Sequence, residues 1–250
     1  MSEAIQKPNE ELFEKKAAVI LNYLKRDLRY GTEIPRPFFV EFTGSPSAGK
    51  TTTIIELDKF LRRCGFRVYK PLEGAEQIRH IERTTPLYNL RTGLYALELL
   101  IDLSHGHMYD VVIFDRCIFD AYVWMMYWQD KGLLEDKEKT GIQKFFLSRF
   151  WADSIDAAYF MVCDPEEAIR REQRIALTSK LGETTNPASV RTLVKRYRNA
   201  FDRLVQNFPQ LTLIDTSSSD EQGMVDKIAL DLLNRFELKA QKERENPSEL

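Results

Sequence analysis

The amino-acid sequence predicts an α/β fold of three layers, in which helices cover both faces of a five-stranded parallel sheet. Segments rich in β-forming residues alternate with segments of helical periodicity along most of the chain. Residues 110–115 are nearly all apolar, which is typical of a strand in the middle of a parallel sheet. A glycine-rich loop separates the first predicted strand from the next helix. This alternation predicts βαβ units with a site at the carboxyl ends of the strands.

The elements follow one another in a simple order. Apolar residues recur at three- and four-residue steps from about residue 10 to residue 30, which predicts an amphipathic helix ahead of the first strand. Strands are predicted over residues 38–43, 66–70, 110–115, 157–163 and 211–215. Helices are predicted over about 50–64, 76–105, 117–132, 139–154, 164–176 and 189–208, with a closing helix from residue 220.

No linker divides the chain, so we expect one main domain over residues 38–238. An N-terminal helical extension would cover residues 1–37, and a disordered tail would cover 239–250. Three roles are open for the extra helix: packing on the sheet, forming a homodimer interface, or docking another protein.

Composition excludes several classes of protein. The formal charge of -2 gives no whole-molecule footprint for nucleic acid, so a nucleic-acid partner is not expected. Three scattered cysteines fit a reducing compartment and no disulfide framework. The N-terminal residues are acidic and polar, and no apolar run reaches the length of a membrane span. We therefore expect a cytoplasmic protein with no membrane partner.

The glycine-rich loop has the spacing G-x-x-x-x-G-K-[ST], which cradles nucleotide phosphates between a strand and a helix. This motif predicts a P-loop NTPase fold that binds ATP with Mg²⁺. We expect the lysine to reach the outer phosphates and the following threonine hydroxyl to bind Mg²⁺. The predicted ATP-binding residues are Gly44, Ser45, Pro46, Ser47, Ala48, Gly49, Lys50, Thr51 and Thr52.

An acid–arginine pair ends the third predicted strand. Asp115 lies where a carboxylate on the Mg²⁺ side of a P-loop is expected, and Arg116 would neutralise charge on the transferred phosphoryl group. Motor-type ATPases usually place a second acid where Arg116 stands. The structural alternatives are a helix cap for Asp115 and a surface ion pair for Arg116. The P-loop favours the functional interpretation.

Two further features complete the predicted site. Glu73 lies just past the second strand, where a carboxylate could accept the proton of an acceptor hydroxyl, although loop acids are often merely solvated. A basic helical pair over about 170–195 has the character of a lid that closes over ATP. Arg170 and Arg174 share one helix face and are the favoured lid residues, while the alternative is a solvated charged hairpin.

These motifs together resemble the thymidylate kinase and deoxynucleoside kinase group of P-loop kinases. The resemblance covers roughly residues 38–233 and includes the lid entry D-P-E-x-A at residue 164. It implies that Arg116 grips the acceptor's phosphate, as in thymidylate kinases, or that Glu73 is the base for a hydroxyl, as in deoxynucleoside kinases. The segment from residue 114 to 124 is also similar to nicotinamide riboside kinases.

The leading hypothesis is therefore an ATP-dependent phosphotransferase acting on a nucleoside or nucleoside monophosphate. Glu73 tilts the choice toward a hydroxyl acceptor, because a phosphate at neutral pH is already anionic and needs cations in place of a base. The rival hypothesis is an ATP-binding interaction module whose lid grips a protein partner. The Asp115–Arg116 pair argues against a motor.

Overall fold

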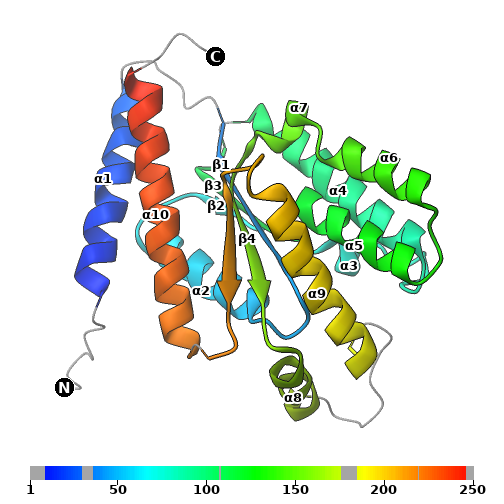
Figure 1. Ribbon diagram of the computed structural model, residues 1–250. Coiled ribbons are helices and arrows are strands. Elements are labelled where there is room, and N and C mark those ends of the chain that lie inside the picture. The colour runs from blue at the N-terminus through cyan, green and yellow to red at the C-terminus, as the bar shows by residue number, and fades with distance from the viewer. Residues whose placement is uncertain (1–8, 30–35, 107, 176–184, 219, 246–250) are drawn as a thin grey trace.

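The computed structural model describes residues 9–29, 36–106, 108–175, 185–218 and 220–245 (Figure 1). Five strands in this part of the chain form one parallel sheet, in the order β2-β3-β1-β4-β5. The predicted α/β fold and its parallel sheet are thus confirmed. The strands are β1 (Phe38–Gly44), β2 (Val68–Tyr69), β3 (Val111–Asp115), β4 (Ile155–Val162) and β5 (Leu211–Asp215).

Helices cover both faces of the sheet, as predicted. The helices are α1 (Glu10–Arg29), α2 (Lys50–Arg63), α3 (Gly74–Gln77), α4 (Pro86–Ser104), α5 (Ile118–Asp130), α6 (Asp136–Phe146), α7 (Arg149–Ala152), α8 (Pro165–Ile175), α9 (Pro187–Leu204) and α10 (Glu221–Glu245). No helix among the described residues is both long enough and apolar enough to cross a membrane.

The side chains of β1 alternate between two separate cores. Phe38, Val40 and Phe42 pack with buried residues of α1, α2 and α10 on one face. Phe39 faces the opposite core, which α4, α5 and α9 supply. Successive side chains of a strand point to opposite faces, so one apolar strand serves both layers. The loop that follows β1 adds Ala48 to the first of these cores.

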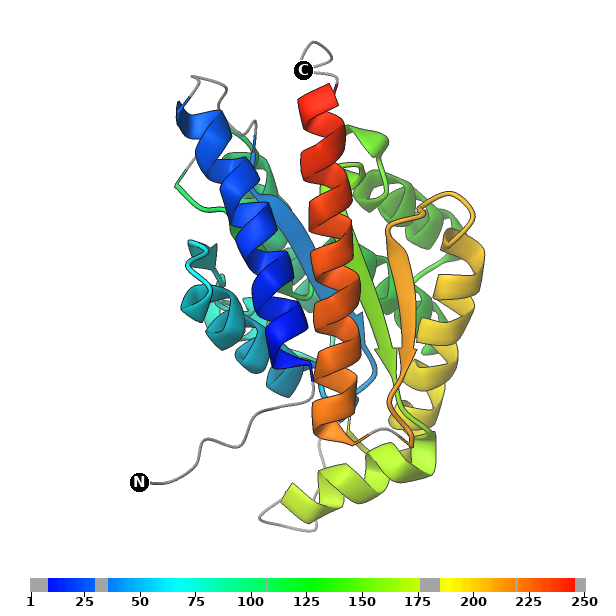
Figure 2. The ribbon, with the colours of Figure 1, turned by 90° about the vertical axis from the view of Figure 1, so that its left-hand side faces the viewer.

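The N-terminal helix packs on the C-terminal helix. Figure 2 shows α1 and α10 side by side over one face of the sheet. Ala17 and Ile20 are buried in the core on this face, and Lys16 forms a salt bridge with Glu237 at 3.0 Å. The first role left open for the extra helix was packing on the sheet, and the helix is observed to pack on α10 in the layer that covers the sheet. The homodimer and docking roles stay predictions.

Three predicted elements have wrong boundaries. The helix expected over 139–154 is two helices, α6 and α7. The helix expected over 76–105 is two helices, α3 and α4, with a non-helical segment at residues 78–85. Pro86 begins α4, and the residue before it, Thr85, is held in an extended conformation, as expected before a proline. The tail expected from residue 239 is helical as far as Glu245, and residues 246–250 lie outside the described part of the chain.

The extra length of α10 has a physical cause. Lys239 forms a salt bridge with the buried carboxylate of Asp156 at 2.5 Å, and Arg36 pairs with the same carboxylate at 2.8 Å. Burial acts to raise the pKa of Asp156, but these two cations hold it below its ordinary value. The next residue, Ala240, is buried. Packing and charge therefore continue the helix past the predicted boundary.

Phe236 provides a test of how α10 packs on the sheet. Its ring is fully buried and stacks on Phe38 with 4.2 Å between the centroids. We expect Phe236→Ala to lower the free energy of unfolding by about 3–5 kcal/mol, as measured by chemical denaturation. Leu238→Ala, on the exposed face of the same helix, should change it by less than about 0.5 kcal/mol. Equal losses in the two variants would contradict the packing described.

Candidate active site

The P-loop is held in place by a close approach of two backbones. Gly44 ends β1 with φ at 147°, and a Cβ atom there would lie 1.9 Å from the carbonyl oxygen of Met161 on β4. Gly49 has φ at 84° and opens α2. Both positions need glycine for the backbone conformation, and at Gly44 the lack of a side chain also lets the loop reach β4.

Lys50 points back toward its own loop. Its ammonium group donates to the carbonyl oxygens of Gly44 at 2.9 Å and Ser45 at 2.7 Å. Burial lowers the pKa of Lys50 to about 8, and the charge of Arg116 acts in the same direction. The carboxylates of Asp115, Asp120 and Glu73 oppose this shift. Lys50 therefore lies within electrostatic reach of the residues described next.

Two buried polar atoms beside the P-loop have no hydrogen-bond partner among the described residues. They are the Ser45 hydroxyl oxygen and Oδ1 of Asp115. Asp115 ends β3 directly beside Phe42 of β1, so its carboxylate lies next to the strand that leads into the loop. A buried carboxylate oxygen without a partner is costly, and it is a suitable ligand for a hard cation. This geometry fits the predicted Mg²⁺ role of Asp115.

The described residues contain no cluster of three or more acidic, histidine or cysteine side chains that could hold a metal alone. Mg²⁺ usually binds through one or two protein oxygens together with substrate phosphates and water. A single carboxylate and the Thr51 hydroxyl, which is exposed at the start of α2, match that pattern.

Arg116 is fixed by a network of ionic contacts. Its backbone lies in the left-handed region with φ at 70°, a conformation that is uncommon for a side chain of this size. Its guanidinium donates to Glu73 at 3.1 Å, to Asp120 at 3.0 Å and to the Tyr197 hydroxyl at 3.2 Å. Burial acts to lower the pKa of Arg116, but Asp120, Tyr197 and Glu73 keep it well above its ordinary value. The guanidinium is thus permanently charged and held in place.

Asp120 and Glu41 belong to this site and were not predicted from the sequence. Asp120 is buried and accepts hydrogen bonds from Thr43 at 2.6 Å and Tyr197 at 2.7 Å. Glu41 is fully buried on β1 and accepts three backbone N–H groups at the start of α5, from residues 117, 119 and 120. Burial raises the pKa of Glu41 to about 8, against these donors. An acid inside an otherwise apolar segment is the signal that could have revealed both residues.

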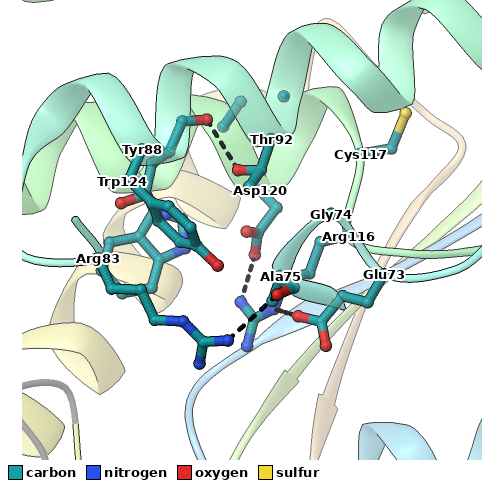
Figure 3. A pocket seen from close by; sticks show the side chains of 13 residues that line it. Glu73, Gly74, Ala75, Arg83, Tyr88, Thr92, Arg116, Cys117, Asp120 and Trp124 are labelled. Atoms are coloured by element: carbon teal, nitrogen blue, oxygen red, sulfur yellow. Dashed lines mark hydrogen bonds and ion pairs between the residues drawn. The ribbon is translucent and has the colours of Figure 1, made fainter. Parts of the chain in front are cut away.

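Glu73 lines a small cavity. The cavity has a volume of about 220 Å³ and lies between α3, α4 and α5. Figure 3 shows the Glu73 and Arg116 side chains meeting at one end of it. Burial raises the pKa of Glu73, although the charge of Arg116 acts against this shift. A basic carboxylate beside a fixed cation can both accept a proton and neutralise charge.

A second, larger cavity is lined by the P-loop itself. Its volume is about 1050 Å³, and its walls are the P-loop with the start of α2, the helix α8, Thr216, and the first turn of α10. Figure 1 shows α8 beyond the carboxyl end of β4. This is the position expected for bound nucleotide in a fold of this kind.

The arginines of the predicted lid lie within the described residues. Arg170 and Arg174 both line the larger cavity, and Arg170 forms an ion pair with Glu167. Arg171, which was not favoured from the sequence, makes the contact with the P-loop: it donates to the carbonyl oxygen of Ser47 at 3.4 Å and to that of Thr216 at 2.9 Å. The polar tip of the predicted lid, at residues 176–184, lies outside the described residues.

Comparison with known proteins supports this assignment of the fold. A family model described as an AAA domain matches residues 39–203, which is more than half of the chain. The chain belongs to this AAA-domain family. The matched range includes the P-loop, Glu73, Asp115, Arg116 and the lid arginines of α8.

Individual relatives of this AAA-domain protein have kinase names. A thymidylate kinase of Caldanaerobacter subterraneus subsp. tengcongensis is 28% identical over 194 residues, which is 71% of this chain and 86% of the relative. A structure of deoxyadenosine kinase from M. mycoides with dCMP and dCDP superposes with a TM-score of 0.58 at 16% identity, covering 79% of this chain and 100% of that one. The same kinase with bound dATP gives 0.54 at 18% identity, covering 78% and 98%. The resemblance predicted from the motifs is confirmed.

The contact at Gly44 yields a direct test of the loop geometry. We expect Gly44→Ala to reduce stability by more than about 3 kcal/mol and to abolish ATP binding, because the added methyl group would overlap a backbone oxygen. Gly132→Ala is the matched control: φ is 72° there, and a Cβ would meet no atom within 4 Å. Its cost should be only the backbone strain of about 1 kcal/mol. Unfolding curves and ATP titration would compare the two, and similar losses would contradict the close approach.

Proposed function

We propose that this protein is an ATP-dependent phosphotransferase that transfers the γ-phosphoryl group to a nucleoside or nucleoside monophosphate. The observation that carries the proposal is that Arg116 and Glu73, which line a cavity of small-molecule size, interact electrostatically with Lys50, which lines the cavity at the P-loop. The kinase names of the relative and of the structural neighbours agree with it.

On the ATP side, the P-loop residues 44–52 would bind the phosphates, with Lys50 as the mobile cation. Its present acceptors are backbone carbonyls, so bound phosphate oxygens can replace them. Asp115 and Thr51 would hold Mg²⁺, which neutralises phosphate charge when bound. Arg171 is the lid cation that now contacts the loop, while Arg170 and Arg174 remain candidates that would reach ATP on closure of the lid.

On the acceptor side, Glu73 would take the proton as the acceptor oxygen attacks the γ-phosphorus. The new bond joins that oxygen to the γ-phosphorus, the bond to the β–γ bridging oxygen breaks, and ADP leaves with its electron pair. Arg116 would stabilise charge on the transferred group. Arg116 already pairs with two carboxylates, so its charge is compensated. This favours an uncharged hydroxyl as the acceptor group, and hence a nucleoside, over an anionic phosphate.

The size of the cavity beside Glu73 fits a small acceptor. Its volume of about 220 Å³ is below the roughly 300–1,000 Å³ typical of pockets for drug-sized ligands. An interaction module would instead use the lid and the N-terminal helix, on which this volume has no bearing. Mg²⁺ dependence, a cytoplasmic location and a homodimer stay predictions from the sequence.

An acceptor screen would test the proposed reaction. The protein would be incubated with γ-labelled ATP, Mg²⁺ and separate nucleosides, monophosphates or oligonucleotides, and the labelled products resolved. We expect label on a nucleoside and loss of that product in Lys50→Met. ATP hydrolysis that depends on Lys50 without any labelled acceptor would contradict phosphotransfer.

Removing the proposed base gives a second test. We expect Glu73→Gln to lower kcat about 10²–10⁴-fold with little change in the KM for ATP. Glu76→Gln, an exposed acid on α3, is the control and should be neutral. Since only the ionised carboxylate accepts a proton, the wild-type rate should rise with pH through the raised pKa of Glu73, and Glu73→Gln should lose that rise. An unchanged kcat in Glu73→Gln would rule Glu73 out as the base.

A further inference from the structure

A groove with a volume of about 420 Å³ lies where α1, α2 and α10 meet (Figure 2). The described residues that line it are all different from those that line the two cavities of the candidate active site. Two of its three walls, α1 and α10, lie outside residues 39–203, which the AAA-domain family model matches. The likeness to that family therefore assigns no role to this groove.

The floor of the groove is apolar and partly aromatic. Phe13 of α1 and Leu57 of α2 are buried there, and Val225 and Ala229 continue the apolar surface along α10. The half-buried ring of Phe60 packs edge-to-face on Phe13, with 5.9 Å between the centroids. The volume lies within the roughly 300–1,000 Å³ typical of small-molecule pockets. This floor fits the apolar part of a small ligand.

The rim of the groove carries an excess of negative charge. Among the described residues that line it, Arg63 is the one basic side chain, whereas four are acidic: Glu10, Glu14, Glu56 and Asp226. The acids come from all three helices, and Glu56 also pairs with Lys59 at 2.7 Å. A surface lined mainly by one sign of charge attracts ligands of the opposite sign. The rim therefore favours a cation.

Two of the acids, on α1 and α10, keep their charge directed at a ligand. The Asp226 carboxylate accepts hydrogen bonds from the amides of Asn9 at 3.2 Å and Gln222 at 2.6 Å. Both donors are uncharged, so these bonds leave its negative charge in place. Burial raises the pKa of the Cys64 thiol, which lines the groove, and the charge of Glu14 acts in the same direction. The negative charge of Glu14 is thus felt inside the groove.

We infer that this groove binds an organic cation with an apolar body, whose ammonium group lies near Glu14 and Asp226 while its apolar part covers Phe13 and Phe60. Burial of apolar surface supplies most of the affinity, and the carboxylates supply the selectivity. The aromatic rings add cation–π attraction. A second copy of this chain is a poorer occupant, because two identical acidic rims repel each other.

Three probes of one chain length isolate the role of charge. Octylammonium, octanol and octanoate would each be titrated into the full-length protein at low ionic strength, by calorimetry. We expect the cation to bind about five- to tenfold more tightly than octanol, and octanoate to bind most weakly. Added salt should reduce this advantage, because Glu14 is exposed to solvent. Equal affinities for the three probes, or no binding of octylammonium, would overturn the inference.

Cys64 reports whether the probe binds in this groove. It is half-buried and lines the groove, whereas Cys117 and Cys163, the other two cysteines of the chain, are buried. We expect saturating octylammonium to slow alkylation of Cys64 by iodoacetamide several-fold, as measured by mass spectrometry. An unchanged rate at saturation would place the probe elsewhere and overturn the inference.

Substitutions at the rim test the contribution of the acids. The double variant Glu14→Gln with Asp226→Asn should lose the preference for octylammonium over octanol, because the rim then attracts a cation less strongly. Glu11→Gln is the matched control, since Glu11 lies on α1 outside the groove lining and pairs with Lys15. A preference that persists in the double variant would contradict the role of these acids.

A substitution on the wall tests the position of the site. Ala18 is exposed and lines the groove, so Ala18→Trp should fill it and weaken octylammonium binding at least about tenfold. Val19→Trp, at the next exposed position and outside the lining, is the control and should bind as the wild type does. Thermal unfolding of each variant would verify that it folds. Equal effects of the two substitutions would contradict the proposed position.

The outcomes also distinguish this site from other occupants and from the proposed reaction. A dimer in analytical ultracentrifugation that Ala18→Trp dissociates would assign the groove to a second copy and overturn the inference. None of these measurements involves ATP. Selective binding of octylammonium without any labelled product in the acceptor screen would therefore uphold the groove as a cation site and refute only the phosphotransfer proposal.

Discussion

The buried contact between Arg116 and Asp120 is the interaction on which the site depends. Asp120 connects three elements, because it accepts hydrogen bonds from Thr43 on β1, Tyr197 on α9 and the guanidinium of Arg116 at the end of β3. The unfavourable backbone conformation of Arg116 persists only because these contacts overdetermine it. The cation is therefore fixed at the wall of the small cavity before any ligand binds, which is the preorganisation that electrostatic catalysis requires.

Strand β1 contacts both the P-loop and the residues around Arg116. Its last residue, Gly44, begins the P-loop, Thr43 donates to Asp120, and Glu41 accepts the backbone N–H groups at the start of α5. A single buried strand thus fixes the phosphate loop and the start of α5. Asp120 lies in the first turn of α5, where the positive end of the helix dipole favours negative charge, and the carboxyl group of Glu41 reaches the same turn from β1. Their burial is tolerable because each has several hydrogen-bond donors.

The sequence predicted those parts of the molecule that depend on local pattern. The P-loop, the five strands and the helical layers follow from the order of apolar and glycine-rich segments. Glu73 and Arg116 were each expected at a strand end, but the ion pair between them was not predicted. Features set by packing between distant residues could not be predicted. The length of α10 depends on Asp156, 83 residues away from Lys239. The choice of Arg171 over its neighbours depends on how α8 meets Ser47, which periodicity alone does not reveal.

The charges around Arg116 also bear on the nature of the acceptor. Its guanidinium contacts two carboxylates, those of Glu73 and Asp120, so the cation is already compensated. A phosphate acceptor would have to displace Glu73 or approach it closely, and two anions in a half-buried site repel each other strongly. A hydroxyl brings no charge and needs a proton acceptor, which Glu73 supplies. The same ion pair that fixes Arg116 therefore disfavours one class of acceptor and prepares the site for the other.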